Sequence, residues 1–298
     1  MASIFRATDT RTGTPVAIKV PHPEMESDPV FFDRFHREQD IGKAMDHPAV
    51  MKVFADDHRT GIYMVMEWVE GRLLRKILDE QKVLPPDRAV NIALGICDAL
   101  SYIHSHGVVH RDLKPENIMV DSAGHIKLID FGIAGQTGAR RLTFAKLSQV
   151  MGTPEYISPE QVKGKRGDAR SDIYALGVML YEMLTGQAPF QGPNPFAIMN
   201  DRLLNNPIPP REINPNIPPE LQEIIYRAIE RDPKNRYANA HEMALDLQHP
   251  EKVGVSERPE LHDWKKRRTP WLRRVLFYIF LALIPVVIFG LMLLFVKR

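Results

Sequence analysis

Residues 110–117 read His-Arg-Asp-Leu-Lys-Pro-Glu-Asn, and residues 130–132, a short distance further on, read Asp-Phe-Gly. Between them lie two apolar, β-branched runs, residues 118–120 and 126–129, on either side of a turn at residues 121–124 that ends in glycine. This pattern predicts a β-hairpin. Because a hairpin holds its two ends side by side, we expect the polar side chains before and after it to lie close together.

Three of these side chains carry oxygen: Asp112, Asn117 and Asp130. Mg²⁺ prefers oxygen ligands, usually one or two carboxylates together with phosphate oxygens and waters. The grouping therefore suits a site that binds a metal ion and phosphate and orients a hydroxyl group. A lone Asp in a loop is more often a simple turn residue, but an eight-residue run followed by Asp-Phe-Gly is too specific for that interpretation.

These motifs resemble the catalytic core of the eukaryotic-type protein kinases and look closest to bacterial membrane-anchored Ser/Thr kinases. The resemblance extends over roughly residues 1–248. It implies an α+β, bilobal kinase fold, with a β-rich N-lobe at about 1–68 and a helical C-lobe at about 70–248. It further implies transfer of the γ-phosphoryl group of ATP to Ser or Thr hydroxyls of proteins, with Mg²⁺ as the metal and Mn²⁺ as a substitute.

The resemblance assigns roles within the loop that opened this section. Asp112 is expected to accept the proton of the substrate hydroxyl, and Asn117 and Asp130 are expected to hold the metal. Lys114, two residues after Asp112, is typical of kinases that act on Ser and Thr, whereas tyrosine kinases usually lack it.

Two short strands around a glycine-containing turn near the N-terminus predict another hairpin, whose second strand ends in Val-Ala-Ile-Lys at Lys19. A helix predicted over about residues 29–45 carries Glu38. By resemblance, Lys19 and Glu38 form an ion pair that directs the ammonium group at the ATP phosphates. Backbone groups of Glu67 and Val69, in a stretch that resembles the hinge between the lobes, are expected to bind the adenine edge.

The segment that follows Asp-Phe-Gly resembles a kinase activation segment, closing with Gly-Thr-Pro-Glu-Tyr-Ile-Ser-Pro-Glu at residues 152–160. Arg111 precedes the expected catalytic aspartate, and kinases with this arginine are typically switched by a phosphate on this segment, because guanidinium binds phosphate in a bidentate fork. Thr143 and Ser148 are the candidate autophosphorylation sites. Thr153 is expected to line the acceptor pocket.

Three further residues are expected to support the site. By resemblance, Arg236 pairs with Glu160. Asp172 precedes a nearly all-apolar helix, so it is interpreted as the helix N-cap. The resemblance implies that Asp172 also anchors the loop that carries Asp112.

Apolar runs predict strands at residues 50–55 and 62–68 and a long helix over residues 86–106. His104 and His106 are interpreted as plain helix-end residues. No Cys or carboxylate lies at ligand spacing from them, so they are not predicted to bind a metal.

The chain has 298 residues, 44% of them apolar, and a formal net charge of +2. This length suffices for two lobes or two domains. Its single cysteine, Cys97, excludes an intrachain disulfide, which fits a reducing compartment. Cys97 lies in an apolar helical pattern and is expected in the core. No nucleic-acid partner is expected.

Residues 275–296 are 22 residues without a charge, and as a helix they would span about 33 Å, enough to cross a bilayer. Six Lys and Arg residues lie at 265–274 and only two follow the span. This bias predicts a single-pass inner-membrane protein with its kinase domain in the cytoplasm. Residues 249–274 are then a basic juxtamembrane linker. The expected partners are the bilayer, Ser- or Thr-containing proteins, and a second copy of the chain for autophosphorylation.

The resemblance implies a first strand and a glycine-rich loop ahead of the strand at residues 1–5, and both are absent from the sequence. Backbone amides of such a loop cradle phosphates, so its loss is expected to weaken ATP binding or slow transfer. Two interpretations stay open: the start is misplaced or truncated, or the protein handles ATP without a phosphate lid. The alternative function is therefore a membrane-tethered pseudokinase scaffold. A kinase of small molecules is a third candidate, which Lys114 and residues 152–160 disfavour.

Overall fold

The computed structural model describes residues 2–26, 29–55, 61–130, 135–136, 154–256 and 278–280, and every structural statement below concerns these residues. One compact unit comprises residues 1–205 and 209–256, and a second comprises residues 206–208 and 257–298. All the elements discussed below belong to the first unit, which contains both a β-rich part and a helical part.

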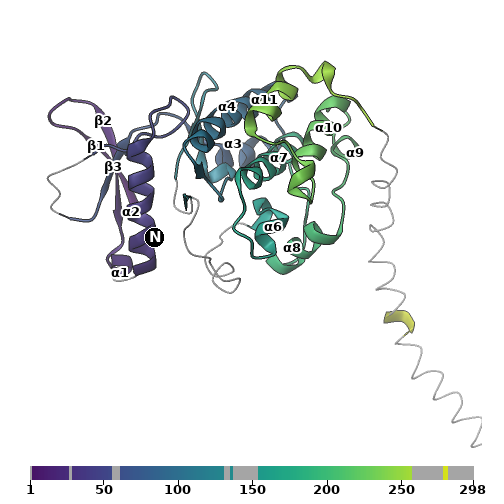
Figure 1. Cartoon of the computed structure of the whole chain (residues 1–298), viewed down its shortest axis with the longest axis horizontal. Helices are drawn as coiled ribbons and strands as arrows, with labels where there is room; N and C mark the ends of the chain where they lie inside the picture. Colours follow the sequence, from purple (N-terminus) through teal and green to yellow (C-terminus); the bar gives the residue numbers. More distant parts are fainter. Residues whose placement is uncertain are drawn as a thin grey trace, which may run out of the picture. The chain divides into compact units, whose positions relative to one another are not determined.

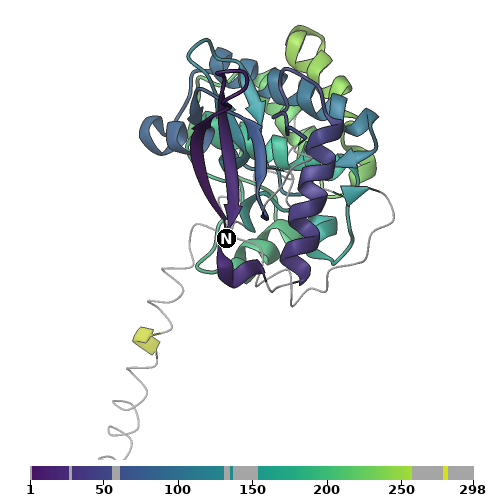
Figure 2. The same cartoon turned by 90° about the vertical axis from the view of Figure 1, so that its left-hand side faces the viewer.

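The β-rich part is built on a three-stranded antiparallel sheet in the order β1 (Ala2–Thr8), β2 (Pro15–Pro21) and β3 (Met64–Glu67). Helices α1 (Pro23–Glu26) and α2 (Pro29–Ala44) follow β2, and α2 lies beside the sheet (Figures 1 and 2). The buried ring of Phe35 packs with Ala17, Met64 and Met66 from the strands. The N-terminal hairpin and the helix predicted near residues 29–45 are therefore confirmed.

The helical part surrounds α7 (Ala169–Thr185), which lies in the middle of the helices in Figure 1. Almost every residue of α7 is buried, as its nearly all-apolar sequence requires. A Cβ at Gly177 would lie 2.6 Å from the Cβ of Ala228, so glycine lets α7 and α10 approach closely. The other helices are α3 (Leu74–Gln81), α4 (Pro86–Ser105), α6 (Pro159–Val162), α8 (Pro195–Leu204), α9 (Pro210–Ile213), α10 (Pro219–Ala228) and α11 (Ala240–Gln248).

The hairpin between the two sequence motifs is present as β6 (Ile118–Val120) and β7 (Ile126–Leu128), which pair antiparallel with Ile118 opposite Leu128. The turn is closed by Asp121, whose Oδ1 accepts the Ala123 and His125 amides, each at 2.9 Å. Short strand β4 (Arg72–Leu73) pairs with β6, and β5 (Val108–Val109) pairs with β8 (Gly135–Gln136).

Strand β7 also joins the helical part to the β-rich part. The Leu128 amide donates to the Ala49 carbonyl at 2.8 Å, and the Met51 amide donates to the Leu128 carbonyl at 2.9 Å. This region departs from the sequence prediction, because residues 50–55 form single bridges at Val50 and Val53 rather than a strand. Val50 forms a β-bridge with Leu128, and Val53 forms one with Met66. The run therefore divides its pairing between two partners.

The ion pair predicted between Glu160 and Arg236 is present and bidentate. Arg236 Nη1 lies 2.9 Å from Glu160 Oε1, and Nη2 lies 2.7 Å from Oε2. Ser171 Oγ donates to the same Oε1 at 2.6 Å, which ties α6 to α7. The Arg236 side chain is fully buried and that of Glu160 is 10% exposed.

We expect Arg236→Met to lower the free energy of unfolding by about 3–5 kcal/mol, because it leaves a buried carboxylate without its counter-charge. Urea denaturation measures the effect. Adding Glu160→Gln to this variant removes the unpaired charge and should restore part of the loss. An equal or larger loss in the double variant would contradict the explanation.

Candidate active site

The loop from His110 to Asn117 is held together by its own polar groups. Asn117 Nδ2 donates to the Asp112 carbonyl at 2.8 Å, and the Asn117 amide donates to the Lys114 carbonyl at 2.9 Å. Lys114 Nζ donates to Asp112 Oδ2 at 2.7 Å. The Asp112 side chain is still 29% exposed, so a group in solution can reach the carboxylate.

A buried carboxylate from α7 anchors this loop. Asp172 Oδ2 accepts the His110 amide at 2.9 Å, and Oδ1 accepts the Arg111 amide at 2.7 Å. Arg111 has φ +65°, a left-handed conformation that a non-glycine residue adopts only when its surroundings hold it there. The two bonds to Asp172 are part of what holds it.

The expectation that Asp172 caps α7 is wrong. The N-cap is Asp168, whose side chain accepts the Arg170 amide at 2.8 Å. Asp172 lies in the first turn of the helix, where it is 1% exposed and turned toward the loop that carries Asp112. The predicted anchoring contact is therefore present, whereas the capping role belongs to a residue four positions earlier.

Sequence reasoning missed the role of His104. Its Nε2 donates to Asp172 Oδ2 at 2.8 Å, so it is more than a helix-end residue. Burial by itself would raise the pKa of Asp172, but the bond from His104, the nearby His110 imidazole and the Arg111 amide together hold that pKa below its usual value. No local pattern indicates this contact, because 68 residues separate its two partners.

The β-rich part contributes the ion pair predicted between Lys19 and Glu38. Lys19 Nζ lies 2.6 Å from Glu38 Oε1 and 3.8 Å from Asp130 Oδ1, so one ammonium group faces carboxylates from α2 and from the end of the hairpin. Asp130 has φ +73°, and the preceding Ile129 amide donates to the Asn117 carbonyl at 2.8 Å. The structure thus brings the predicted residues on both sides of the hairpin to one place.

The oxygen groups here fit a hard cation such as Mg²⁺. Because Asn117 Nδ2 is bonded to the Asp112 carbonyl, the amide oxygen is left as the ligating atom of that side chain. The Asp130 carboxylate is 46% exposed. One carboxylate and one amide oxygen, with room for waters and phosphate oxygens, match the preference of Mg²⁺. Within the described residues, no group of three or more His, Cys, Asp or Glu side chains forms a metal site.

The titration of Glu38 is strongly perturbed. Burial, reinforced by the Asp130 carboxylate, raises the pKa of Glu38 to about 7, although Lys19 acts in the opposite direction. The pKa of Lys19 is raised as well, because its two carboxylate neighbours outweigh its own burial. The charge state of this pair is therefore sensitive to pH near neutrality.

The predicted hinge is partly occupied by internal contacts. The Glu67 amide donates to the Lys52 carbonyl at 2.9 Å, so that N–H group already has a partner. The Glu67 carboxylate accepts Lys127 Nζ from β7. Val69 is half-buried. Adenine binding at Glu67 and Val69 stays a prediction.

The candidate phosphorylation sites Thr143 and Ser148, and Thr153 of the acceptor pocket, lie outside the described residues. Arg111, their expected partner, is described. Burial and the neighbouring Arg166 guanidinium lower the pKa of Arg111 to about 10, against the opposing effect of Asp172 and Asp168.

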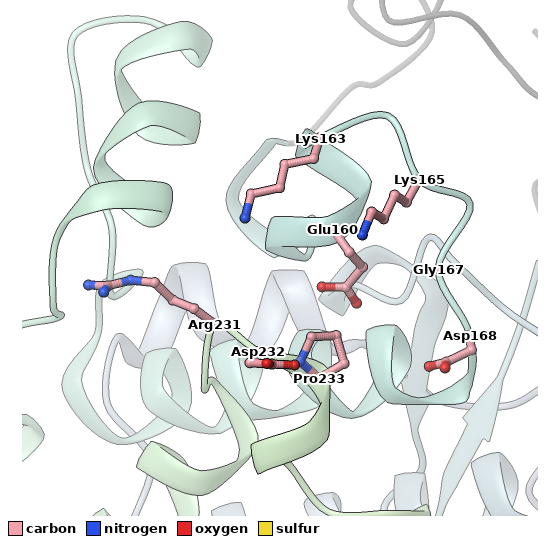
Figure 3. Close-up of a pocket in the computed structure, with 8 residues that line it drawn as sticks. All are labelled: Glu160, Lys163, Lys165, Gly167, Asp168, Arg231, Asp232 and Pro233. Carbon is pink, nitrogen blue, oxygen red and sulfur yellow. The ribbon is translucent and has the colours of Figure 1, made fainter.

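A pocket of about 540 Å³ lies beside α6 and the start of α7 (Figure 3). Each of its carboxylates has a structural role: Asp168 caps α7, Asp232 accepts the Lys234 amide at 3.0 Å, and Glu160 pairs with Arg236. Among the predicted residues only Glu160 lines it, so this pocket is not the candidate active site.

Comparison with known proteins agrees with this geometry. The chain belongs to the protein kinase domain family, whose model matches residues 1–250. It is 40% identical over 253 residues to a probable serine/threonine-protein kinase of Streptomyces coelicolor, covering 83% of this chain and 38% of that protein. Identity is 39% over 252 residues to serine/threonine-protein kinase PknB of Mycolicibacterium smegmatis, covering 83% of this chain and 40% of the relative.

A probable serine/threonine-protein kinase PknB of Corynebacterium glutamicum is 38% identical over 271 residues, covering 88% of this chain and 42% of the relative. The chain therefore spans about two fifths of the length of the curated relatives it matches.

We expect the stability of the metal-free protein to fall as the pH rises from about 4.5 to 7, relative to Glu38→Gln. The folded-state pKa of Glu38 is above its unfolded value, so the folded protein binds more protons in this window and loses stability as they leave. The contribution of this group should decrease by up to about 3 kcal/mol. Thermal or urea unfolding at several pH values measures it. Parallel pH profiles for both proteins would contradict the assignment.

Proposed function

We propose that this chain is a serine/threonine protein kinase that transfers the γ-phosphoryl group of ATP to Ser or Thr hydroxyls of proteins. The observation that carries the proposal is the grouping of the Asp112 loop with the cluster of Lys19, Glu38 and Asp130, where Lys19 Nζ lies 2.6 Å from Glu38 and 3.8 Å from Asp130. The names of the relatives support Ser and Thr as the acceptors.

In this proposal each described side chain has one task. Asp112 orients the acceptor hydroxyl and takes its proton. The hydroxyl oxygen forms a bond to the γ-phosphorus. At the same time the bond between that phosphorus and the β-phosphate oxygen breaks. Lys114, 2.7 Å from Asp112, places a positive charge beside the transferred group. Lys19, held by Glu38, binds the non-transferred phosphates. Positioning and electrostatics supply most of the rate enhancement in such a reaction.

Asn117 and Asp130 are the proposed metal ligands. A bound Mg²⁺ (or Mn²⁺) would neutralise charge on the phosphates. The hairpin fixes the backbone of both residues relative to each other, since the Asn117 carbonyl accepts the Ile129 amide at 2.8 Å and Asp130 follows directly. The bond from Asn117 Nδ2 to the Asp112 carbonyl at 2.8 Å links this pair to the Asp112 loop.

We further propose that activity rises when Thr143 or Ser148 is phosphorylated by a second copy of the chain. Arg111 supports this, because a dianionic phosphate would offset the repulsion between Arg111 and Arg166 that helps lower the pKa of Arg111. Thr153 is proposed to line the acceptor pocket, and backbone groups of Glu67 and Val69 to bind adenine.

We also propose that residues 275–296 anchor the protein in the inner membrane with its kinase domain in the cytoplasm. The support is the uncharged run of 22 residues and the basic cluster that precedes it. In the part of the chain that the structure describes, no helix has the length and apolar character needed to cross a bilayer, and of this run only Tyr278–Phe280 are described.

The alternatives predict different outcomes in one assay. A pseudokinase scaffold would transfer no phosphate, and a small-molecule kinase would label no protein. We expect the chain to transfer ³²P from γ-labelled ATP to a generic basic protein, and Asp112→Ala to lose about 10²–10⁴-fold in rate because proton acceptance is removed. Asp121→Asn, a change in the hairpin turn outside the site, is the matched control and should stay active. Equal labelling by Asp112→Ala and the unmodified chain would contradict the role of Asp112.

Membrane anchoring is tested by fractionation. The full chain should remain with membranes after a carbonate wash, whereas a chain that ends at residue 256 should be released, because it lacks the apolar run. A full chain with Ile288→Arg should be retained less well, since a charge near the middle of a spanning helix costs about 2.5–3.5 kcal/mol. Release of the unmodified full chain would refute the anchor.

A further inference from the structure

One fully buried side chain near the proposed acceptor site has no role in the mechanism above. Arg202 of α8 is 0% exposed, which is unusual for a charged residue. Among the described residues no carboxylate lies within ion-pair distance of it, and its Nε atom has no hydrogen-bond partner. Burying an ionised group is costly unless hydrogen bonds compensate it. The groups around Arg202 must therefore offset the cost of burying its charge.

The Arg202 guanidinium binds backbone carbonyls. Nη1 donates to the Pro154 carbonyl at 2.8 Å, and Nη2 donates to the Glu155 carbonyl. The rings of Tyr174 and Phe190 flank its Cζ, with centroids at 5.9 and 5.7 Å. Arg202 is therefore fixed by cation–π contacts and fixes, in turn, two consecutive peptide groups.

Those peptide groups belong to the 3₁₀ turn Pro154–Tyr156, which follows Thr153 directly. The same turn is held from a second direction, because Tyr156 Oη lies within hydrogen-bond distance of Glu182 Oε2, and Glu182 also binds Arg75 of α3 at 2.6 Å. The two anchors act on different atoms. Glu182 holds a side chain, whereas Arg202 holds the backbone.

We propose that Arg202 is a positioning residue for the protein acceptor: by binding the Pro154 and Glu155 carbonyls, it sets the orientation of the segment that directly follows Thr153, the residue proposed to line the acceptor pocket. This inference rests on the proposed kinase function. A planar guanidinium that donates to two consecutive carbonyls fixes both the place and the rotation of the segment. A lysine ammonium is a point charge without this fork and cannot reproduce both bonds.

A purely structural role of Arg202 predicts a different effect on the two KM values. If Arg202 only stabilised the helical part, its replacement would lower stability and would affect ATP and peptide kinetics alike. A positioning role predicts a split, with a raised KM for the peptide and an unchanged KM for ATP, because Lys19 and Glu38 lie on other elements.

The test uses the full chain with Arg202→Lys and Arg202→Met, a serine-containing peptide and ATP. We expect the peptide KM to rise at least about tenfold in both variants, as expected for loss of charge-assisted hydrogen bonds, with the ATP KM unchanged within about twofold. Arg211→Lys is the matched control, since Arg211 also donates to a backbone carbonyl, that of Ile217 at 3.0 Å, and has no contact with residues 154–156. It should leave both KM values unchanged.

A milder variant distinguishes a loss of positioning from a folding defect. Phe190→Leu keeps an apolar side chain in the core but removes one ring from the guanidinium, so the peptide KM should rise less than in Arg202→Lys, and the melting temperature should fall less than in Arg202→Met. Hydrogen exchange at the amides of residues 155–158 should become faster in each Arg202 variant and in Phe190→Leu, but not in Arg211→Lys.

An unchanged peptide KM, a parallel rise of both KM values, or unchanged exchange at residues 155–158 would overturn the proposal. Absence of transfer by the unmodified chain would instead contradict the proposed function, and with it the acceptor role of Arg202. Hydrogen exchange would then still report whether Arg202 holds the segment.

Discussion

The arrangement of the candidate active site depends on one buried carboxylate. Asp172 accepts the His110 and Arg111 amides and the His104 imidazole, and it is 1% exposed. Arg111 stands in a left-handed conformation next to Asp112, so a loop without this anchor would be free to relax. An ionised carboxylate with several donors is a strong acceptor in an apolar surrounding. A nearly all-apolar helix thus carries the charge that shapes the loop.

The second constraint is the connection between the β-rich part and the helical part. Bonds from Leu128 to Ala49 and Met51 attach the hairpin to the segment that leads into β3. Lys19 then faces Asp130 at 3.8 Å, just beyond the end of that hairpin. The hairpin, which presents the proposed metal ligand Asp130, therefore also fixes the distance between Asp130 and Lys19 of the β-rich part.

The sequence predicted what depends on local pattern and on family motifs. The hairpin, the helices near residues 29–45 and 86–106, and the pairs Lys19–Glu38 and Glu160–Arg236 were all inferred from residue types and their order. Contacts without a local signal were missed, since His104 and Asp172 are 68 residues apart. Residues 50–55 have strand composition, but their pairing is divided between Leu128 and Met66, which no periodicity reveals. Asp172 was taken for a helix cap because the true cap, Asp168, precedes Ala169, Arg170 and Ser171 rather than the apolar run.

Buried polar groups converge on one short segment, residues 154–160. Arg202 binds its backbone, Glu182 binds Tyr156, and Arg236 with Ser171 binds Glu160. Apolar residues of similar size would fill this space at least as stably, because burying charge is costly even when it is paired. Apolar contacts, however, tolerate small shifts, whereas hydrogen bonds to a planar guanidinium or a carboxylate constrain direction. Directional bonds at this segment therefore contribute orientation more than stability, and orientation is what the proposed role of this segment beside the acceptor pocket requires.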